Sequence, residues 1–165
     1  MSHDCAVDLA ALQTLLTTVV APWVTNLNLR VVAATPGEVT LALPIAPRHV
    51  HDGGVLCGQA LMAAADTAMI LAIVSQTGAF QPMTKVQLQT SFLRPIPGKP
   101  AGDSAENAAG KPAGNPAADA DGSPAEARVI ARVLRLGKRL VFGEIEVQDP
   151  AGRLAAHATA TYALL

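Results

Sequence analysis

Asp66 is the residue of this sequence whose type is hardest to reconcile with its surroundings. The segment from Gly53 to Thr84 is 32 residues long and contains no other charged residue. A lone carboxylate in an apolar segment costs several kcal/mol unless it is paired, hydrogen-bonded or needed for chemistry. We therefore take Asp66 as the first candidate for a chemical role. The alternative is that Asp66 is only a hydrogen-bonded carboxylate at an interface between subunits.

A polar loop ahead of this segment offers further reactive side chains: His49, His51, Asp52 and, at its end, Cys57. A thiol at the start of a helix can act as a nucleophile with a histidine as its base, here Cys57 with His51. The alternative is that Cys57 only fills space as a small apolar residue. The spacing matches no zinc pattern, so we expect no metal site. In an extended loop His49 points away from His51, and we expect it at the surface.

The apolar segment itself predicts a long helix that ends near Gly78. Its most apolar part, 55–74, is long enough to span a membrane. However, Asp66 lies in its middle, and no Lys or Arg flanks it closely on the N-terminal side. We therefore expect a helix buried within a folded domain and no membrane span.

The remaining elements predict a sheet that curls around this helix. Asp4 or Asp8 can cap an N-terminal helix that runs to about Val20, with Pro22 as its stop. Alternating residues predict two strands around the turn Pro36-Gly37 and three late strands separated by tight breaks. The strands are expected at 27–35, 38–44, 84–93, 128–136, 139–149 and 153–164. Short turns indicate an antiparallel meander near the C-terminus. The predicted fold class is α+β, an antiparallel sheet around one apolar helix with an extra N-terminal helix.

Composition and charge exclude several classes of protein. The 165 residues carry a formal net charge of -1 at pH 7, which argues against a partner that is nucleic acid or an anionic membrane. Two cysteines are too few for a disulfide framework, and the first 28 residues hold no Lys or Arg of an export signal. We therefore expect a cytoplasmic protein.

Residues 98–127 have a composition unlike the rest. They include no Val, Ile, Leu, Met or aromatic residue, so burial cannot offset the entropy lost on ordering them. We expect a flexible Ala/Gly/Pro-rich insertion between two strands of a single domain, 1–165.

The loop and the long helix together resemble the signature of one family. Residues 51–68, HDGGVLCGQALMAAADTA, are similar to the hotdog-fold acyl-CoA thioesterases of the PaaI-like (phenylacetic acid degradation) group. That signature reads Asn, two residues, Gly, two residues, His-Gly-Gly, six residues, Asp. Phe92–Pro95, Leu136–Arg139 and Ala158–Tyr162 resemble later strands of the family. The resemblance covers most of the chain apart from the first 20 or so residues and the insertion, and it implies a hotdog fold.

The resemblance implies roles for two residues of the helix. Gly58 would present its backbone N–H to the thioester carbonyl, which suits the free N–H groups at a helix N-terminus. The alternative is that Gly58 only permits close packing. Asp66 would act as general base for a water molecule or as nucleophile on the thioester carbon, in a site that a partner subunit often completes. An apolar cleft strengthens a carboxylate as a base.

Three positions depart from the family pattern. His51 stands at the family Asn, and Cys57 stands at the family His. If His51 replaces the Asn, activity should change between about pH 5.5 and 7.5; otherwise His51 is a loop residue in solvent. Lys85 stands where the family commonly has Ser or Thr, with Thr84 beside it. This departure suggests either a shifted register that uses Thr84 or an altered substrate preference.

The resemblance also implies a coenzyme A substrate. In similar proteins basic residues at strand ends meet the phosphates of coenzyme A, although such charges can also be merely solvated. The residues expected to bind substrate or coenzyme A are Gly54, Gln59, Thr84, Lys85, Arg94, Lys138 and Arg139.

The function implied is acyl-CoA thioesterase activity. The catalytic candidates are Asp66, Gly58, His51 and Cys57, with no cofactor other than the coenzyme A of the substrate, and the chain is expected to form a dimer or a dimer of dimers. The departures favour one alternative, a non-catalytic acyl-CoA-binding or regulatory hotdog module. A hotdog hydratase would need a His-Phe-Pro-Gly-like loop, which the sequence does not contain.

Overall fold

The structure, a computed structural model, describes residues 8–98 and 125–165. Two short helices come first, α1 (Leu9–Thr18) and α2 (Pro22–Thr25), followed by strands β1 (Arg30–Thr35) and β2 (Glu38–Pro44). A short 3-10 turn, Pro47–His49, leads to the long helix α3 (Gly58–Thr77). Four strands complete the fold: β3 (Met83–Phe92), β4 (Glu126–Leu136), β5 (Leu140–Gln148) and β6 (Leu154–Leu164).

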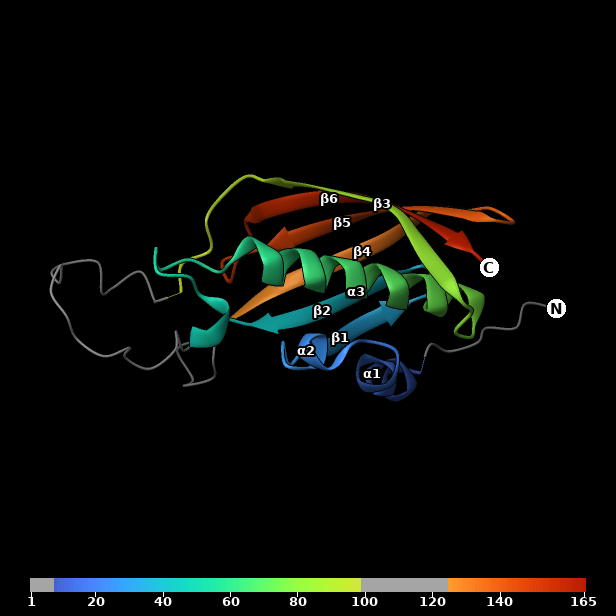
Figure 1. The fold of residues 1–165 in the computed structure, drawn as a ribbon, viewed down its shortest axis with the longest axis horizontal. Helices are drawn as coiled ribbons and strands as arrows, with labels where there is room; N and C mark the ends of the chain where they lie inside the picture. Colours follow the sequence, from blue (N-terminus) through green and yellow to red (C-terminus); the bar gives the residue numbers. More distant parts are fainter. Residues whose placement is uncertain (1–7, 99–124) are drawn as a thin grey trace, which may run out of the picture.

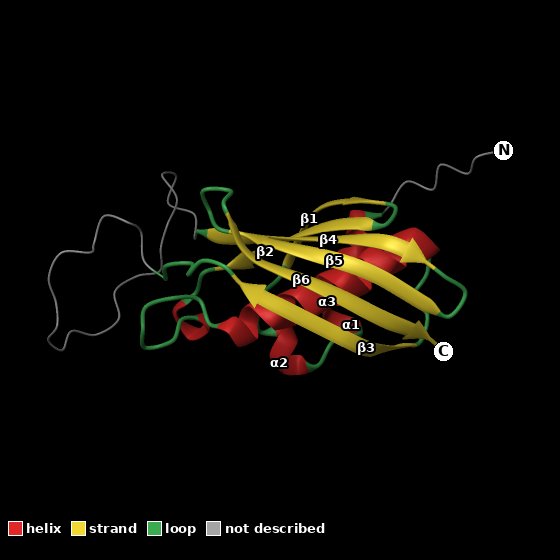
Figure 2. Ribbon diagram, turned by 90° about the horizontal axis from the view of Figure 1, so that it is seen from above, coloured by secondary structure: helices red, strands yellow, loops and turns green. Residues whose placement is uncertain are grey.

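The six strands form one antiparallel sheet in the order β1-β2-β4-β5-β6-β3. The predicted C-terminal meander is confirmed, because β4, β5 and β6 are consecutive neighbours. In Figure 1 α3 lies along one face of the sheet, and Figure 2 shows the strands covering it from the opposite side. The fold class predicted from the sequence is therefore correct.

The ends of the helices follow from local residue chemistry. The Asp8 side chain caps α1 by accepting a hydrogen bond from the Ala10 N–H at 2.9 Å. Gly78 ends α3 in the left-handed conformation, with φ of 78°, which glycine adopts without strain. Pro22 does more than stop α1, because it occupies the start of α2, where its missing N–H costs no hydrogen bond.

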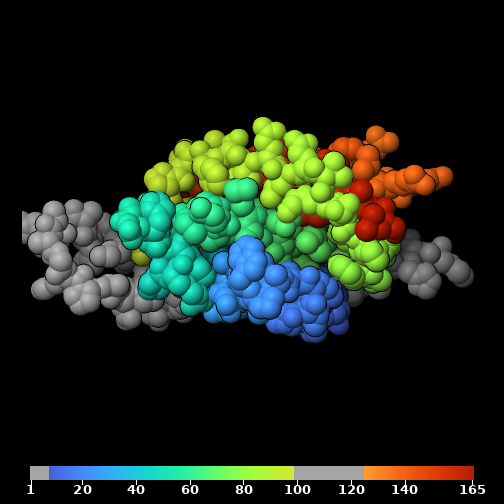
Figure 3. All heavy atoms as spheres, viewed as in Figure 1, coloured from blue at the N-terminus to red at the C-terminus, as the bar shows by residue number. Residues whose placement is uncertain are grey.

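One side of α3 stays open although most of the helix is core. Its inner residues pack on β2, β4 and β5, and they include Ala64, Ala68, Met69 and Leu71, all fully buried. The helix is long and apolar enough to cross a membrane, but 61% of its apolar stretch of 18 residues is buried inside the protein. Gln59, Met62 and Asp66 lie on the less buried side, and Figure 3 shows this side as a strip between β3 and the N-terminal helices.

The predicted insertion, 98–127, lies mostly outside the described residues. Its last two positions belong to the sheet, since β4 begins at Glu126, which pairs with Pro44. Ala125 and Ala127 are buried. The sequence prediction placed the start of this strand too late because it searched for large apolar residues. Alanine is small, but it can also be buried against a neighbouring strand.

Gly143 lets α3 approach the sheet more closely than any side chain would allow. A Cβ atom at this position would overlap the Met69 side chain and lie 2.8 Å from the Arg132 carbonyl oxygen. We therefore expect Gly143→Ala to lower the free energy of unfolding by about 1–3 kcal/mol through overpacking. Denaturant unfolding of Gly143→Ala and of Gly152→Ala measures this. Gly152 lies in open space at a positive φ, whereas Gly143 does not have a positive φ. The Gly152 variant therefore measures the cost of backbone strain without a clash, and the Gly143 variant measures the cost of the clash without that strain.

Candidate active site

Two donors from neighbouring strands hold the carboxylate of Asp66. The Lys85 ammonium lies 2.7 Å from Oδ2, and the Tyr162 hydroxyl donates to Oδ1. The same hydroxyl lies 3.3 Å from the Asp66 backbone carbonyl oxygen. Asp66 therefore pairs with a charge and accepts a hydrogen bond, which explains how an apolar helix tolerates it.

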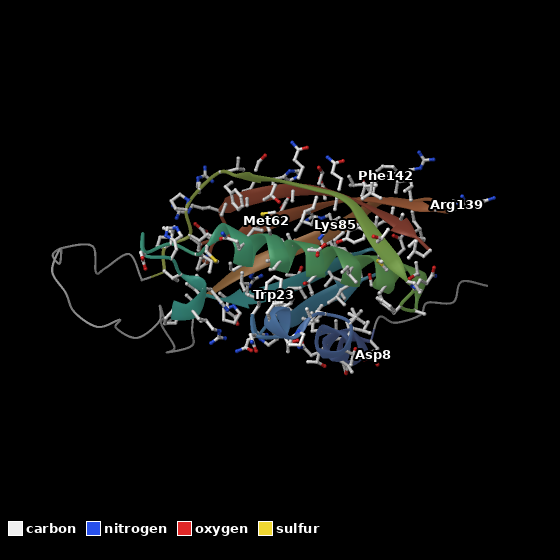
Figure 4. The ribbon with its side chains drawn as sticks, viewed as in Figure 1. Asp8, Trp23, Met62, Lys85, Arg139 and Phe142 are labelled. Atoms are coloured by element: carbon white, nitrogen blue, oxygen red, sulfur yellow. The ribbon has the colours of Figure 1, made fainter. Side chains whose placement is uncertain are left out.

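The pairing of β3 with β6 brings these two donors together. Lys85 and Tyr162 are direct partners across the strands, so their side chains project from the same face of the sheet, toward α3. Figure 4 shows Lys85 beside α3. A β-bulge follows, since Val86 is skipped and Gln87 pairs with Thr161. Thr84 pairs with Ala163 one position earlier and so faces the other side of the sheet, away from Asp66.

Tyr162 remains a hydrogen-bond donor across the ordinary pH range. Burial is the largest cause that raises the pKa of its phenol, and the charge of Asp66 and the hydrogen bond to it raise the pKa further. Because ionising the phenol would place a second negative charge beside Asp66, the proton stays on the tyrosine oxygen.

The N-terminus of α3 forms a separate pocket with free backbone donors. Cys57 is the N-cap residue and makes no side-chain capping bond, so the first N–H groups of the helix, including that of Gly58, have no partner within the helix. A pocket of about 350 Å³ opens here, and its lining includes Gly58, Leu61, Phe92 and Arg94. The Phe92 ring covers Gly58, because a Cβ there would lie 3.0 Å from Cζ of the ring.

Within one chain, Asp66 and Gly58 lie at different levels of α3. Eight residues of helix separate them by about 12 Å along the axis and about 80° around it. If Asp66 attacked a carbonyl carbon directly, that carbon would lie within about 3.5 Å of it, and the carbonyl oxygen would then be out of reach of the Gly58 N–H. In the single chain the pocket at Gly58 and the carboxylate of Asp66 are therefore two separate features of α3.

The loop before α3 places its two histidines differently from expectation. His51 is exposed, and its Nδ1 accepts a hydrogen bond from the Gly53 N–H at 2.9 Å. The prediction that His49 lies at the surface was wrong, since His49 is 4% exposed. The loop turns as a 3-10 helix there, so that His49 Nδ1 donates to the Pro44 carbonyl oxygen at 3.0 Å.

Cys57 lies half-buried as a free thiol between this loop and α3. Its backbone N–H donates to the His49 carbonyl oxygen at 2.8 Å, which fixes the start of the helix. In the part of the chain that the structure describes, no three His, Cys, Asp or Glu residues are grouped closely enough for a metal ion. Gly54 takes a positive φ of 75° in the loop, and its carbonyl oxygen accepts from the Gly98 N–H at 2.8 Å.

The basic candidates lie at opposite ends of the sheet. Arg94 lines the pocket at Gly58 and donates to the Leu154 carbonyl oxygen at 2.9 Å. Lys138 and Arg139 lie in the turn between β4 and β5, where the Arg139 carbonyl oxygen accepts from Leu164. Leu154 and Leu164 are the two ends of β6, roughly 30 Å apart. Figure 4 shows Arg139 at the far end of the molecule from the start of α3.

Sequence reasoning missed the part that Tyr162 plays. It is the one tyrosine of the chain and is 2% exposed. A buried tyrosine usually directs its hydroxyl to a polar partner, and its position in an alternating strand predicts that it faces the central helix. These two signals together identify a neighbour for the one charge on that helix.

Comparisons with known proteins find similar chains of the same fold. No family model matches the chain. The chain is 26% identical over 128 residues, 78% of its length and 76% of the relative, to the Thermoplasma volcanium protein named "Putative esterase TV1331". Among solved structures, zebrafish thioesterase superfamily member 2 has a TM-score of 0.71 and 19% identity, covering 97% of this chain and 100% of that one.

Two further structures extend this likeness. An Asn-to-Asp mutant of the phenylacetic acid degradation protein PaaI from Thermus thermophilus has a TM-score of 0.64 and 23% identity, covering 88% of this chain and 100% of that one. A hypothetical thioesterase from Streptococcus pneumoniae, solved with coenzyme A, has a TM-score of 0.63 and 12% identity over 84% of this chain and 86% of that one. At these identities the shared property is the fold, which is the fold that the sequence resemblance implies.

Proposed function

We propose that this protein hydrolyses acyl-CoA thioesters to a free acid and coenzyme A. The observation that carries the proposal is the pair of half-sites on α3, an Asp66 carboxylate on the open face and free N–H donors at Gly58 beside a pocket. A base and an oxyanion donor are the two groups that thioester hydrolysis requires. The likeness to thioesterase-superfamily structures and to one esterase-type relative supports this assignment.

In this proposal Asp66 takes a proton from a water molecule, and the resulting hydroxide adds to the thioester carbon. The carbonyl oxygen becomes an oxyanion, which the Gly58 N–H and the positive end of the α3 dipole stabilise. The C–S bond then breaks, and the thiolate of coenzyme A leaves and takes up the proton. Direct attack by Asp66 on the carbon, followed by hydrolysis of the anhydride, uses the same two groups.

A second copy of the chain would join the half-sites. β3 is an edge strand, and exposed apolar side chains lie along it and on the open face of α3, namely Met62, Val86, Phe92 and Leu93. Such an edge invites pairing with another chain. If two copies meet with their α3 helices antiparallel about a two-fold axis near Met62, Asp66 of one copy lies opposite Gly58 of the partner subunit. The proposed unit is therefore a homodimer, or a dimer of dimers.

The same symmetry provides a binding site for coenzyme A. In an antiparallel dimer, the end of one sheet that carries the turn between β4 and β5 would lie near Arg94 of the partner subunit. Lys138 and Arg139 of the partner subunit would then add charge to the pocket that contains Gly58, and such charges favour phosphate groups. The structural neighbour solved with coenzyme A supports this choice of substrate.

The alternative function is an acyl-CoA-binding module without turnover. One observation favours it: both oxygens of Asp66 are already engaged, by Tyr162 and by Lys85. A carboxylate held in this way binds a water molecule less readily than a free one.

Release of free thiol separates these functions. Purified protein is incubated with short, aromatic and long acyl-CoA substrates while free coenzyme A is measured. We expect turnover of at least one substrate class, and treatment with a metal chelator should leave it unchanged because the proposed mechanism uses no metal. Micromolar binding of acyl-CoA without release of thiol would replace the proposal by the binding module.

A further inference from the structure

The two side chains that hold the carboxylate of Asp66 differ greatly in burial. On one side Tyr162 is 2% exposed and donates to Oδ1. On the other side Lys85 pairs with Oδ2, and the Lys85 side chain is 37% exposed. The core therefore fixes one oxygen of the carboxylate, and the other faces the open side of α3.

We propose that Tyr162 is the positioning residue of the site, which turns Oδ1 of Asp66 into the core so that Oδ2 is the oxygen that reacts. This inference rests on the proposed hydrolysis and adds the group that orients its base. Nothing in the pairing requires Tyr162 to touch the substrate.

The packing around the tyrosine gives it this role. Its ring is part of the core between β6 and α3. If the hydroxyl left Asp66, it would become an unpaired polar atom in the core, which is costly. The hydroxyl also reaches the carbonyl oxygen of Asp66 itself. Its single hydrogen is shared between the side chain and the backbone of the same residue, with the shorter contact to Oδ1, and this restricts rotation of the carboxylate.

Lys85 differs from Tyr162 in its freedom to move. An exposed ammonium on a flexible stem gains little from its ion pair, because water competes for both charges. It can withdraw when a substrate or a water molecule approaches Oδ2. The tyrosine keeps its hydrogen bond meanwhile, so the orientation of Asp66 survives the loss of the ion pair.

The kinetic test removes only the hydroxyl. We expect Tyr162→Phe to lower kcat for thioester hydrolysis by about 10- to 100-fold, while KM changes by less than about threefold because substrate contacts are retained. The matched control is Thr159→Val, which removes a hydroxyl from an exposed position of the same strand and is expected to leave kcat unchanged. An unchanged kcat in Tyr162→Phe, or a rise in KM alone, would overturn the proposal.

A second measurement does not depend on activity. Because the chain has one tyrosine, the Cζ resonance of isotopically labelled tyrosine reports only on Tyr162. Donation to a carboxylate polarises the phenol, so Asp66→Asn should move this resonance, and Thr159→Val should not. If the wild-type protein lacks turnover but the resonance responds to Asp66→Asn, the proposed function fails and the contact stands. If Asp66→Asn leaves the resonance unchanged, Tyr162 is not a positioning residue.

Discussion

Replacing Asp66 by asparagine should lower kcat for thioester hydrolysis by about 100- to 10,000-fold, the range typical for loss of a general base. Asparagine has nearly the same shape and can still accept the hydrogen bond from Tyr162. It cannot take a proton from water, and it cannot attack the thioester as a carboxylate. The rate of thiol release at saturating acyl-CoA, measured for both proteins, gives the ratio directly.

The controls for this substitution separate chemistry from folding. Asp66 and Lys85 are both partly exposed, so losing their ion pair should change the free energy of unfolding by less than about 1 kcal/mol. Asp52→Asn removes an exposed carboxylate from the preceding loop and should leave kcat unchanged. If Asp66→Asn kept its activity while Cys57→Ser lost it, the thiol would be the nucleophile and the proposed role of Asp66 would be wrong.

The sequence was sufficient to predict the central helix and its charged residue. Hydropathy predicts the helix, because nearly every side chain from Leu61 to Val74 is apolar and most of them are buried against the sheet. Gly78 predicts the end of the helix because few other residues adopt a positive φ. The single charge predicts a partner for Asp66, since an unpaired carboxylate would destabilise the core.

The partners of Asp66 could not be predicted from the same patterns. β3 lies next to β6, the last strand in sequence, and no local signal encodes that pairing. The bulge at Val86 adds one residue to the strand, which changes the face on which every later side chain lies. The resemblance left the choice between Thr84 and Lys85 open, because Lys85 stands where the family commonly has Ser or Thr. In the structure Lys85 is the one of the two that faces Asp66.

The loop shows a similar dependence on turn geometry. Residues 47–49 form a 3-10 turn, so a rule based on an extended chain places His49 on the wrong side. Its burial is stabilised by a backbone carbonyl from β2, which is a contact between segments and not a property of the loop sequence.

Gly58→Pro should lower kcat by about 100- to 1,000-fold, the usual cost of losing one oxyanion donor. Gly58 is the first residue of α3, a position that proline favours because its N–H has no helical partner. Cys57 already has φ of -71° and ψ of 144°, the extended conformation that a residue before proline requires. The substitution therefore removes the proposed donor and preserves the helix, which circular dichroism and kinetics together can verify.

Gly58→Ala is the matched control, because alanine retains the N–H and adds only a Cβ atom. That atom would lie 3.0 Å from Phe92 Cζ, and the ring is exposed enough to shift by a few tenths of an ångström. We expect Gly58→Ala to alter KM more than kcat. Equal losses of kcat in the alanine and proline variants would mean that Gly58 serves packing and that another group stabilises the oxyanion.

Mixing the two inactive variants tests whether the half-sites belong to different subunits. If each site combines Asp66 of one chain with Gly58 of the partner subunit, a mixed dimer of Asp66→Asn and Gly58→Pro contains one intact site and one doubly altered site. Random exchange of subunits should then restore about a quarter of the wild-type activity in an equimolar mixture. If both groups of a site came from one chain, no mixture would recover activity. Recovery of activity would therefore establish the dimer as the catalytic unit.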